Sequence, residues 1–170
     1  ADFSSAYNLA RAYEFEDKTQ LAIELLSSTV KDHPLELQAQ LMLLRLKRSQ
    51  LRSSRVEPEM FEAMIRNIEL DLTHLRKESP VPQLVKGYAC LLFSFRSKLQ
   101  QEGFNKAEAC FNEAIARFGE TEDAVAGLAL IERARGNTEK AVEKTKNLIR
   151  ISSDPRKLFV LARLHENFQQ

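Results

Sequence analysis

Residues 6–34 read AYNLARAYEFEDKTQLAIELLSSTVKDHP, and this stretch combines small and large apolar side chains at helical spacing. Ala10 and Ala22 are small, and each is followed by a large residue on the same helix face, Tyr13 and Leu26. Residues three and four apart are neighbours on the surface of an α-helix. Two helices approach closely where one carries little bulk, while large side chains fill the space beside that contact. The stretch therefore predicts two antiparallel helices that pack through alanines.

Helical spacing of apolar residues continues through the rest of the chain, and no stretch alternates as a β-strand would. Asn105, with Glu108 three residues later, resembles a capping box and predicts a helix start there. Short connections predict that consecutive helices are antiparallel neighbours. The further helices are predicted over 35–51, from Pro58 to Leu75, from Leu84 past Phe95, from Asn105 to Gly119, from Val125 to Gly136, over 141–149 and from Leu158.

Composition limits the fold and function classes. Apolar residues make up 44% of the 170 residues and charged residues 29%, which favours a folded globular protein over a disordered one. Five glycines and five prolines are too few for a barrel or sandwich of many short strands. The start has no signal-peptide pattern, and no apolar run approaches the roughly 18 residues of a membrane span. Two cysteines, Cys90 and Cys110, are expected to be reduced and packed as small hydrophobic residues, which indicates a cytoplasmic protein.

The opening stretch resembles the tetratricopeptide repeat, a helix-turn-helix unit of about 34 residues. With Phe3 as position one, the family's preferred Trp, Leu, Gly, Tyr, Ala, Phe, Ala and Pro fall on Ala6, Leu9, Ala10, Tyr13, Ala22, Leu26, Thr29 and Pro34. Four of these positions are identical to the family's preference, and most of the others are compatible in size. Later parts of the chain fit the same spacing at Val125, Leu128, Ala129, Gly136 and Ala141, and at Ala107, Phe111 and Ala114.

The resemblance implies a single all-α domain over 1–170, a right-handed α-solenoid of antiparallel helix pairs. The repeat units are predicted at about 3–36, 37–80, 82–121 and 122–155, followed by a trailing helix at 156–170. The unit at 37–80 lacks the alanine landmarks and is predicted to be degenerate. An ordinary helical bundle with chance alanines is the alternative.

The resemblance also implies a concave surface lined by the first helix of each pair. Phe15, Leu41 and Met42 are expected on that surface as apolar or aromatic contacts. The predicted partner-binding residues are Tyr7, Asn8, Arg11, Arg45, Arg48, Lys86, Phe93, Arg96 and Arg133.

Arginine dominates this predicted surface, although the net charge of the chain is only +1. The planar guanidinium binds carboxylates through two hydrogen bonds and stacks on aromatic rings. We therefore expect a scaffold or adaptor that binds an acidic and apolar segment of another protein. Alternatively, the arginines are solvated and pair with Glu14, Asp123 and their neighbours, which would stabilise the fold by only about 0–1 kcal/mol per pair.

RNA is a second candidate partner for the same surface. The stretch RLKRSQLRSSR at 45–55 contains five basic residues and no acidic one. Basic side chains contact phosphates, and Tyr7 and Phe93 could stack on bases. A solvated helix face remains the alternative for this stretch. Self-association through the ends of the helix stack is a further possibility, because stack ends expose apolar faces unless they are capped.

The sequence contains no pattern of an enzyme, so no catalytic residue, cofactor or metal site is predicted. It has no zinc-protease motif, phosphate-binding loop, dinucleotide fingerprint or nucleophile elbow. His74 follows Asp71 by three residues, but a single pair of this kind is more often a solvated helix face than a metal site. His33 precedes Pro34 and is expected at a helix end.

Overall fold

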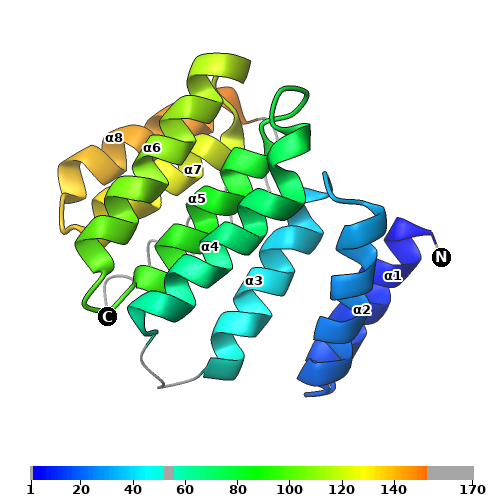
Figure 1. The fold of residues 1–170 in the computed structure, drawn as a ribbon. Coiled ribbons are helices and arrows are strands. Elements are labelled where there is room, and N and C mark those ends of the chain that lie inside the picture. Colours follow the sequence, from blue (N-terminus) through cyan, green and yellow to red (C-terminus); the bar gives the residue numbers. More distant parts are fainter. Residues whose placement is uncertain (1, 52–55, 153–170) are drawn as a thin grey trace.

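The computed structural model describes residues 2–51 and 56–152, and helices dominate both ranges. Within them lie eight α-helices and one short 3₁₀ helix, and no strand occurs there. Figure 1 shows α3 between α2 and α4, with α5 to α8 continuing the stack on the other side. This arrangement confirms the predicted all-α solenoid. The helices are α1 (Phe3–Phe15), α2 (Thr19–Asp32), α3 (Leu37–Leu51), α4 (Pro58–Leu72), η1 (Thr73–Leu75), α5 (Val81–Ser94), α6 (Gln100–Phe118), α7 (Glu122–Ala134) and α8 (Thr138–Ile151).

The first helix pair forms as its small and large residues predict. The Asp2 carboxylate caps α1 by accepting hydrogen bonds from the backbone N–H groups of Ser4 and Ser5, each at 3.3 Å. Ala10 on α1 and Ala22 on α2 are both completely buried. The absence of bulk at these two positions lets the antiparallel helices approach closely.

The middle of the stack departs from a regular succession of pairs. The close backbone approaches of α3 are to α2 and α5, and those of α4 are to α5 and to η1, which directly follows it. Leu43, Leu44 and Leu46 give α3 a bulky buried surface. Bulky side chains hold helices farther apart than alanines do. The assignment of 37–80 to a degenerate repeat unit stays a prediction.

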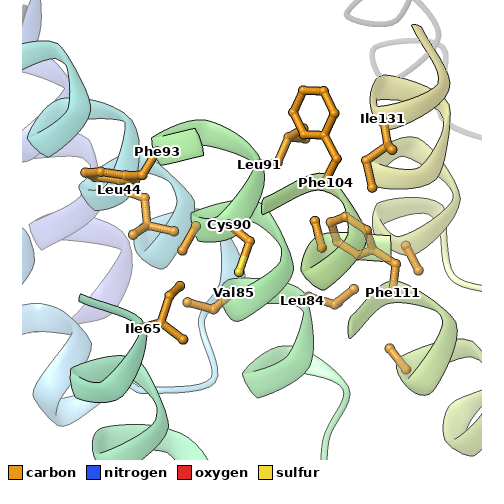
Figure 2. Packing of buried hydrophobic residues seen from close by; sticks show 14 of the residues in the cluster. Leu44, Ile65, Leu84, Val85, Cys90, Leu91, Phe93, Phe104, Phe111 and Ile131 are labelled. Atoms are coloured by element: carbon orange, nitrogen blue, oxygen red, sulfur yellow. The ribbon is translucent and has the colours of Figure 1, made fainter. Parts of the chain in front are cut away.

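The main hydrophobic core surrounds α5 (Figure 2). Phe111 of α6 is completely buried in it. A Cβ atom added at Gly87 of α5 would lie 2.8 Å from the Phe111 ring, and one added at Gly127 of α7 would lie 2.4 Å from it. The ring therefore occupies space that two glycines leave free on neighbouring helices.

The connection between α5 and α6 differs from the sequence prediction. α5 ends at Ser94, and α6 begins at Gln100 rather than at Asn105. A Cβ added at Gly103 would lie 2.1 Å from the Ser94 Cβ, so the two helices meet backbone to backbone at this point. The first turn of α6 thus includes the glycine at which this helix comes closest to α5.

The predicted capping box at Asn105 is consequently wrong. Asn105 and Glu108 lie inside α6 and bind the side chain of Arg135, which follows α7. The Arg135 Nη2 group donates to Asn105 Oδ1 at 2.8 Å, and Nη1 donates to a Glu108 carboxylate oxygen. The two polar residues therefore hold α6 to the end of α7 instead of starting a helix.

Two further sequence predictions concern the turns and the C-terminal end. His33 is the C-cap residue of α2, as its position before Pro34 predicted. The predicted trailing helix at 156–170 lies outside the described residues, as do Arg52 and Arg55 of the basic stretch.

Both cysteines are free and buried, which confirms the prediction that they pack as small hydrophobic residues. Burial is the main reason that the thiol pKa of Cys90 rises to about 12 and that of Cys110 to about 11. An unfolded chain would ionise these thiols near their ordinary value of 9.0. The unfolded state therefore binds fewer protons than the native state above about pH 9.

We expect the free energy of unfolding to fall as the pH rises from 9 towards 11. The slope should reach up to about 1.4 kcal/mol per pH unit for each thiol. Urea unfolding at pH 8, 9 and 10 measures it. A Cys90→Ala/Cys110→Ala variant should show a shallower dependence over this range, and equal slopes in the two proteins would contradict the prediction.

Candidate partner-binding face

The first candidate site is a surface shared by α1 and α3. Tyr7, Arg11 and Glu14 are spaced i, i+4 and i+7 on α1, and Leu41, Arg45 and Arg48 have the same spacing on α3. An ion pair joins the two helices, because Arg45 Nη1 donates to Glu14 Oε1 at 2.5 Å and Nη2 donates to Oε2 at 3.0 Å. The α1–α3 face is defined here as Tyr7, Asn8, Arg11, Glu14, Leu41, Arg45 and Arg48.

Arg45 and Arg11 both favour the ionised form of the Glu14 carboxyl, and Arg45 has the larger effect. The hydrogen bond from Arg45 is the main cause of the lowered pKa of the Glu14 carboxyl, and the charges of Arg45 and Arg11 add to it. The same hydrogen bond raises the pKa of Arg45. Glu14 therefore remains ionised. Its carboxylate forms an ion pair with Arg45 and is also attracted by the charge of Arg11. The face retains an excess of positive charge.

Arg48 connects the α1–α3 face to α5. Its Nε group donates to the backbone carbonyl of Leu92 at 3.3 Å, in the last turn of α5. The last carbonyls of a helix lack intrahelical partners and carry partial negative charge, so a cation is favourable there. Arg48 therefore has a structural contact as well as a half-buried position on the face.

The ion pair bears out part of the alternative interpretation of the arginines. Arg45 pairs with Glu14, as that interpretation expected for this acid. Both side chains are solvent-accessible, so the pair stabilises the fold by about 0.2–1 kcal/mol. The pair also shows that the exposed surfaces of α1 and α3 lie within reach of one another's side chains.

Phe15 is the residue of this region to which sequence reasoning gave too little weight. It was expected on the concave surface but not among the partner-binding residues, and its side chain is 93% exposed. It lines a shallow hollow with Asn8, Arg11 and Glu14. A phenylalanine in the last turn of a helix, followed by the polar residues of a turn, was the available signal.

Phe93, Met42 and Lys86 are not where the sequence placed them. Phe93 is only 4% exposed and packs in the core near Leu44 (Figure 2), so the prediction that its ring lines a groove is wrong. Met42 is also buried in the core. Lys86 points to the opposite side, where its Nζ donates to Glu69 of α4 at 2.5 Å.

An error in helical register explains the misplaced Lys86 of α5. Two residues of α5 contact the neighbouring helices α7 and α3 through hydrogen bonds: the Tyr88 hydroxyl donates to the Asp123 carbonyl of α7 at 2.7 Å, and the Leu92 carbonyl accepts from Arg48 of α3. Lys86 precedes Tyr88 by two residues, which is a rotation of about 200° around a helix. The predicted position of Lys86 therefore fell on the wrong side of α5.

Arg96 and Arg133 lie farther along the stack. Arg96 follows the end of α5 instead of lying within it, with a φ of 57° and its guanidinium carbon 5.2 Å from the centre of the Phe95 ring. It is exposed. Arg133 is in the last turn of α7 and half-buried, and desolvation lowers its pKa. Their part in partner binding stays a prediction.

Comparison with protein families gives one match. Residues 94–154, which include α6, α7 and α8, match the family model of the tetratricopeptide repeat. This part of the chain is similar to the tetratricopeptide repeat. The match covers positions where small and large residues were predicted to follow the repeat, including Ala107, Ala114 and Ala141, all of which are buried.

Tetratricopeptide repeats generally mediate protein–protein interaction, and the family is typically a non-enzymatic scaffold.

No curated protein matched the chain in a sequence search. Among the residues that the structure describes, none of the helices has the length and apolar character needed to cross a membrane. In the same residues, no three His, Cys, Asp or Glu side chains are grouped so that they could hold a metal ion.

Proposed function

We propose that this protein is a scaffold that binds a segment of a partner protein on the α1–α3 face. The segment carries acidic residues for Arg11 and Arg48 and an apolar or aromatic residue for Phe15. The observation that carries the proposal is the Glu14–Arg45 ion pair, because it holds the exposed surfaces of α1 and α3 together as one face.

Three features of the face support an acidic and apolar segment. Arg11 is exposed and makes no ion pair within the described residues. Tyr7 is half-buried and stacks on Phe3, with ring centres 5.7 Å apart, so its ring is held in place. Phe15 offers an exposed aromatic anchor beside Arg11. Aromatic residues and arginine are the types that contribute most strongly at protein interfaces.

RNA is a less suitable partner for the α1–α3 face than a protein segment, because the face also carries a negative charge. Glu14 lies in the middle of the face and neutralises part of its positive charge. A phosphate backbone would have to approach this carboxylate, whereas a protein segment can place one acid on Arg11 and an apolar group elsewhere.

The test is a binding titration with two fluorescent probes, an acidic peptide containing leucine and phenylalanine and a single-stranded RNA of mixed sequence. We expect the peptide to bind and Arg11→Glu to weaken it about tenfold or more, since the substitution replaces attraction by repulsion. Lys140→Glu is the matched control, because Lys140 is exposed on α8, far along the stack. It changes the net charge equally and should leave binding within about twofold.

Salt dependence separates the two partner classes. RNA binding should fall steeply between 50 and 200 mM salt, whereas a peptide anchored by apolar contacts should retain much of its affinity. Peptide binding that is weakened equally by Arg11→Glu and Lys140→Glu would show a nonspecific charge effect and overturn the proposed face. RNA binding in the absence of peptide binding would favour the second partner class.

A further inference from the structure

A second hollow lies on the other side of α3, between α2 and α4. It is a groove of about 610 Å³. Leu43 and Leu44 of α3 form its apolar floor, Val30 of α2 lines one wall, and Met64 and Ile68 of α4 line the other. These residues define the α2–α4 groove.

The α2–α4 groove is distinct from the α1–α3 face. Lys47 lines the groove, while Arg45 belongs to the face. Two residues correspond to a rotation of about 200° around a helix, so these side chains leave α3 in nearly opposite directions. A ligand in the groove would therefore contact none of Tyr7, Arg11 or Arg45.

The shape of the groove fits an α-helix. Its α4 wall runs from Met60 to Leu72, which corresponds to about 18 Å or just over three helical turns. Its walls belong to two helices, and α3 lies between them (Figure 1). An amphipathic helix binds such a groove by placing apolar residues at i, i+3, i+4 and i+7 along the floor. Met60, 44% exposed, and Met64 offer flexible thioether side chains that adapt to a helix surface.

The charges around the groove specify the occupant further. Lys31 of α2 and Lys47 of α3 line one side, and Asp71 of α4 lines the other. None of the three makes an ion pair within the part of the chain that the structure describes. Carboxylates along one flank of a bound helix would complement both lysines, and a basic residue on its other flank would complement Asp71.

We infer that the α2–α4 groove is a second binding site, which takes an amphipathic helix of a partner protein with an acidic flank. The chain then has two independent recognition surfaces, on opposite sides of α3. Such an arrangement lets the protein connect two partner segments at once, or two segments of one partner with increased avidity.

The test uses a synthetic helical peptide of about 18 residues. The peptide has leucines at i, i+3, i+4 and i+7, glutamates on one flank, a lysine at one end of the other flank and alanines elsewhere. Calorimetric titration of the full chain carrying Arg11→Glu, which weakens binding at the α1–α3 face, should show one peptide bound in the groove. Met64→Lys places a charge inside the groove and should weaken binding about tenfold or more. Lys140→Glu, at an exposed position of α8 that lines neither surface, is the control and should leave binding within about twofold.

A charge exchange keeps the test independent of folding. The Lys31→Glu/Lys47→Glu variant should bind the glutamate peptide about tenfold more weakly, and it should bind a peptide with lysines in place of those glutamates more tightly than the natural protein does. A misfolded variant would not gain this affinity. No binding at millimolar peptide, no effect of Met64→Lys, or no recovery in the charge exchange would overturn the inference. A concentration-dependent dimer that Met64→Lys abolishes would assign the groove to a second copy of the chain and would also overturn it.

Discussion

Replacing Phe111 by alanine should lower the free energy of unfolding by about 3–5 kcal/mol. The Phe111 ring is completely buried in the main core and packs edge-on against Tyr88, with ring centres 5.0 Å apart. Because Gly87 and Gly127 have no side chain to move into the vacated volume, the site collapses poorly. The largest losses from such truncations occur where the surroundings relax least.

Urea unfolding followed by circular dichroism measures the effect. Phe15→Ala removes the same atoms from a side chain that is 93% exposed, and it should change stability by less than about 0.5 kcal/mol. A loss below about 1 kcal/mol for Phe111→Ala would contradict the described packing of α5, α6 and α7. A double variant with Gly127→Leu, which restores apolar volume from the opposite helix, should recover part of the loss.

Gly103→Ala should destabilise the protein by about 1–3 kcal/mol or more, although alanine is the better helix former. The added Cβ would lie 2.0 Å from Ser94 Oγ, 2.1 Å from Ser94 Cβ and 3.0 Å from the Cys90 carbonyl oxygen. Rotation of the Ser94 side chain removes only the first of these contacts. Relief therefore requires that α5 and α6 move apart in the centre of the core.

Two variants distinguish steric conflict from intrinsic helix propensity. Ala116→Gly changes an exposed position of the same helix and should cost about 1 kcal/mol, so that alanine is favoured there. The Ser94→Gly/Gly103→Ala double variant moves the missing Cβ to the other helix and should recover much of the stability lost in Gly103→Ala. A Gly103→Ala protein as stable as the natural one would show that the helices do not meet as described.

The sequence by itself determined the all-α fold class and showed the resemblance to a helical repeat. Ala10, Ala22 and Leu26 mark the close helix contact of the first pair, and these three residues are completely buried in the structure. This inference succeeded because small and large residues at helical spacing are a local pattern, readable along one helix at a time. The burial of Cys90 and Cys110 followed from the same kind of local reasoning.

Only the tertiary structure decided the register of α5 and the start of α6. Nearly every position of α5 is apolar and many are buried, so no polar face marks the side that meets solvent. Lys86 was assigned to the wrong side for this reason, and Phe93 was expected at the surface although it is buried in the core near Leu44 of α3. The start of α6 depends on the contact between Gly103 and Ser94, which no pattern within α6 reveals.

The two candidate surfaces also differ in how much the sequence revealed and how much only the tertiary structure decided. Arg11, Arg45 and Arg48 were placed on one surface by the positions that the resemblance to the repeat assigns to them. The sequence suggested that Glu14 pairs with an arginine, but it did not show which one. That choice and the α2–α4 groove both depend on the distances between helices that are far apart in the sequence. Those distances are set by how side chains from several helices fill one shared core, and a single chain segment does not contain that information.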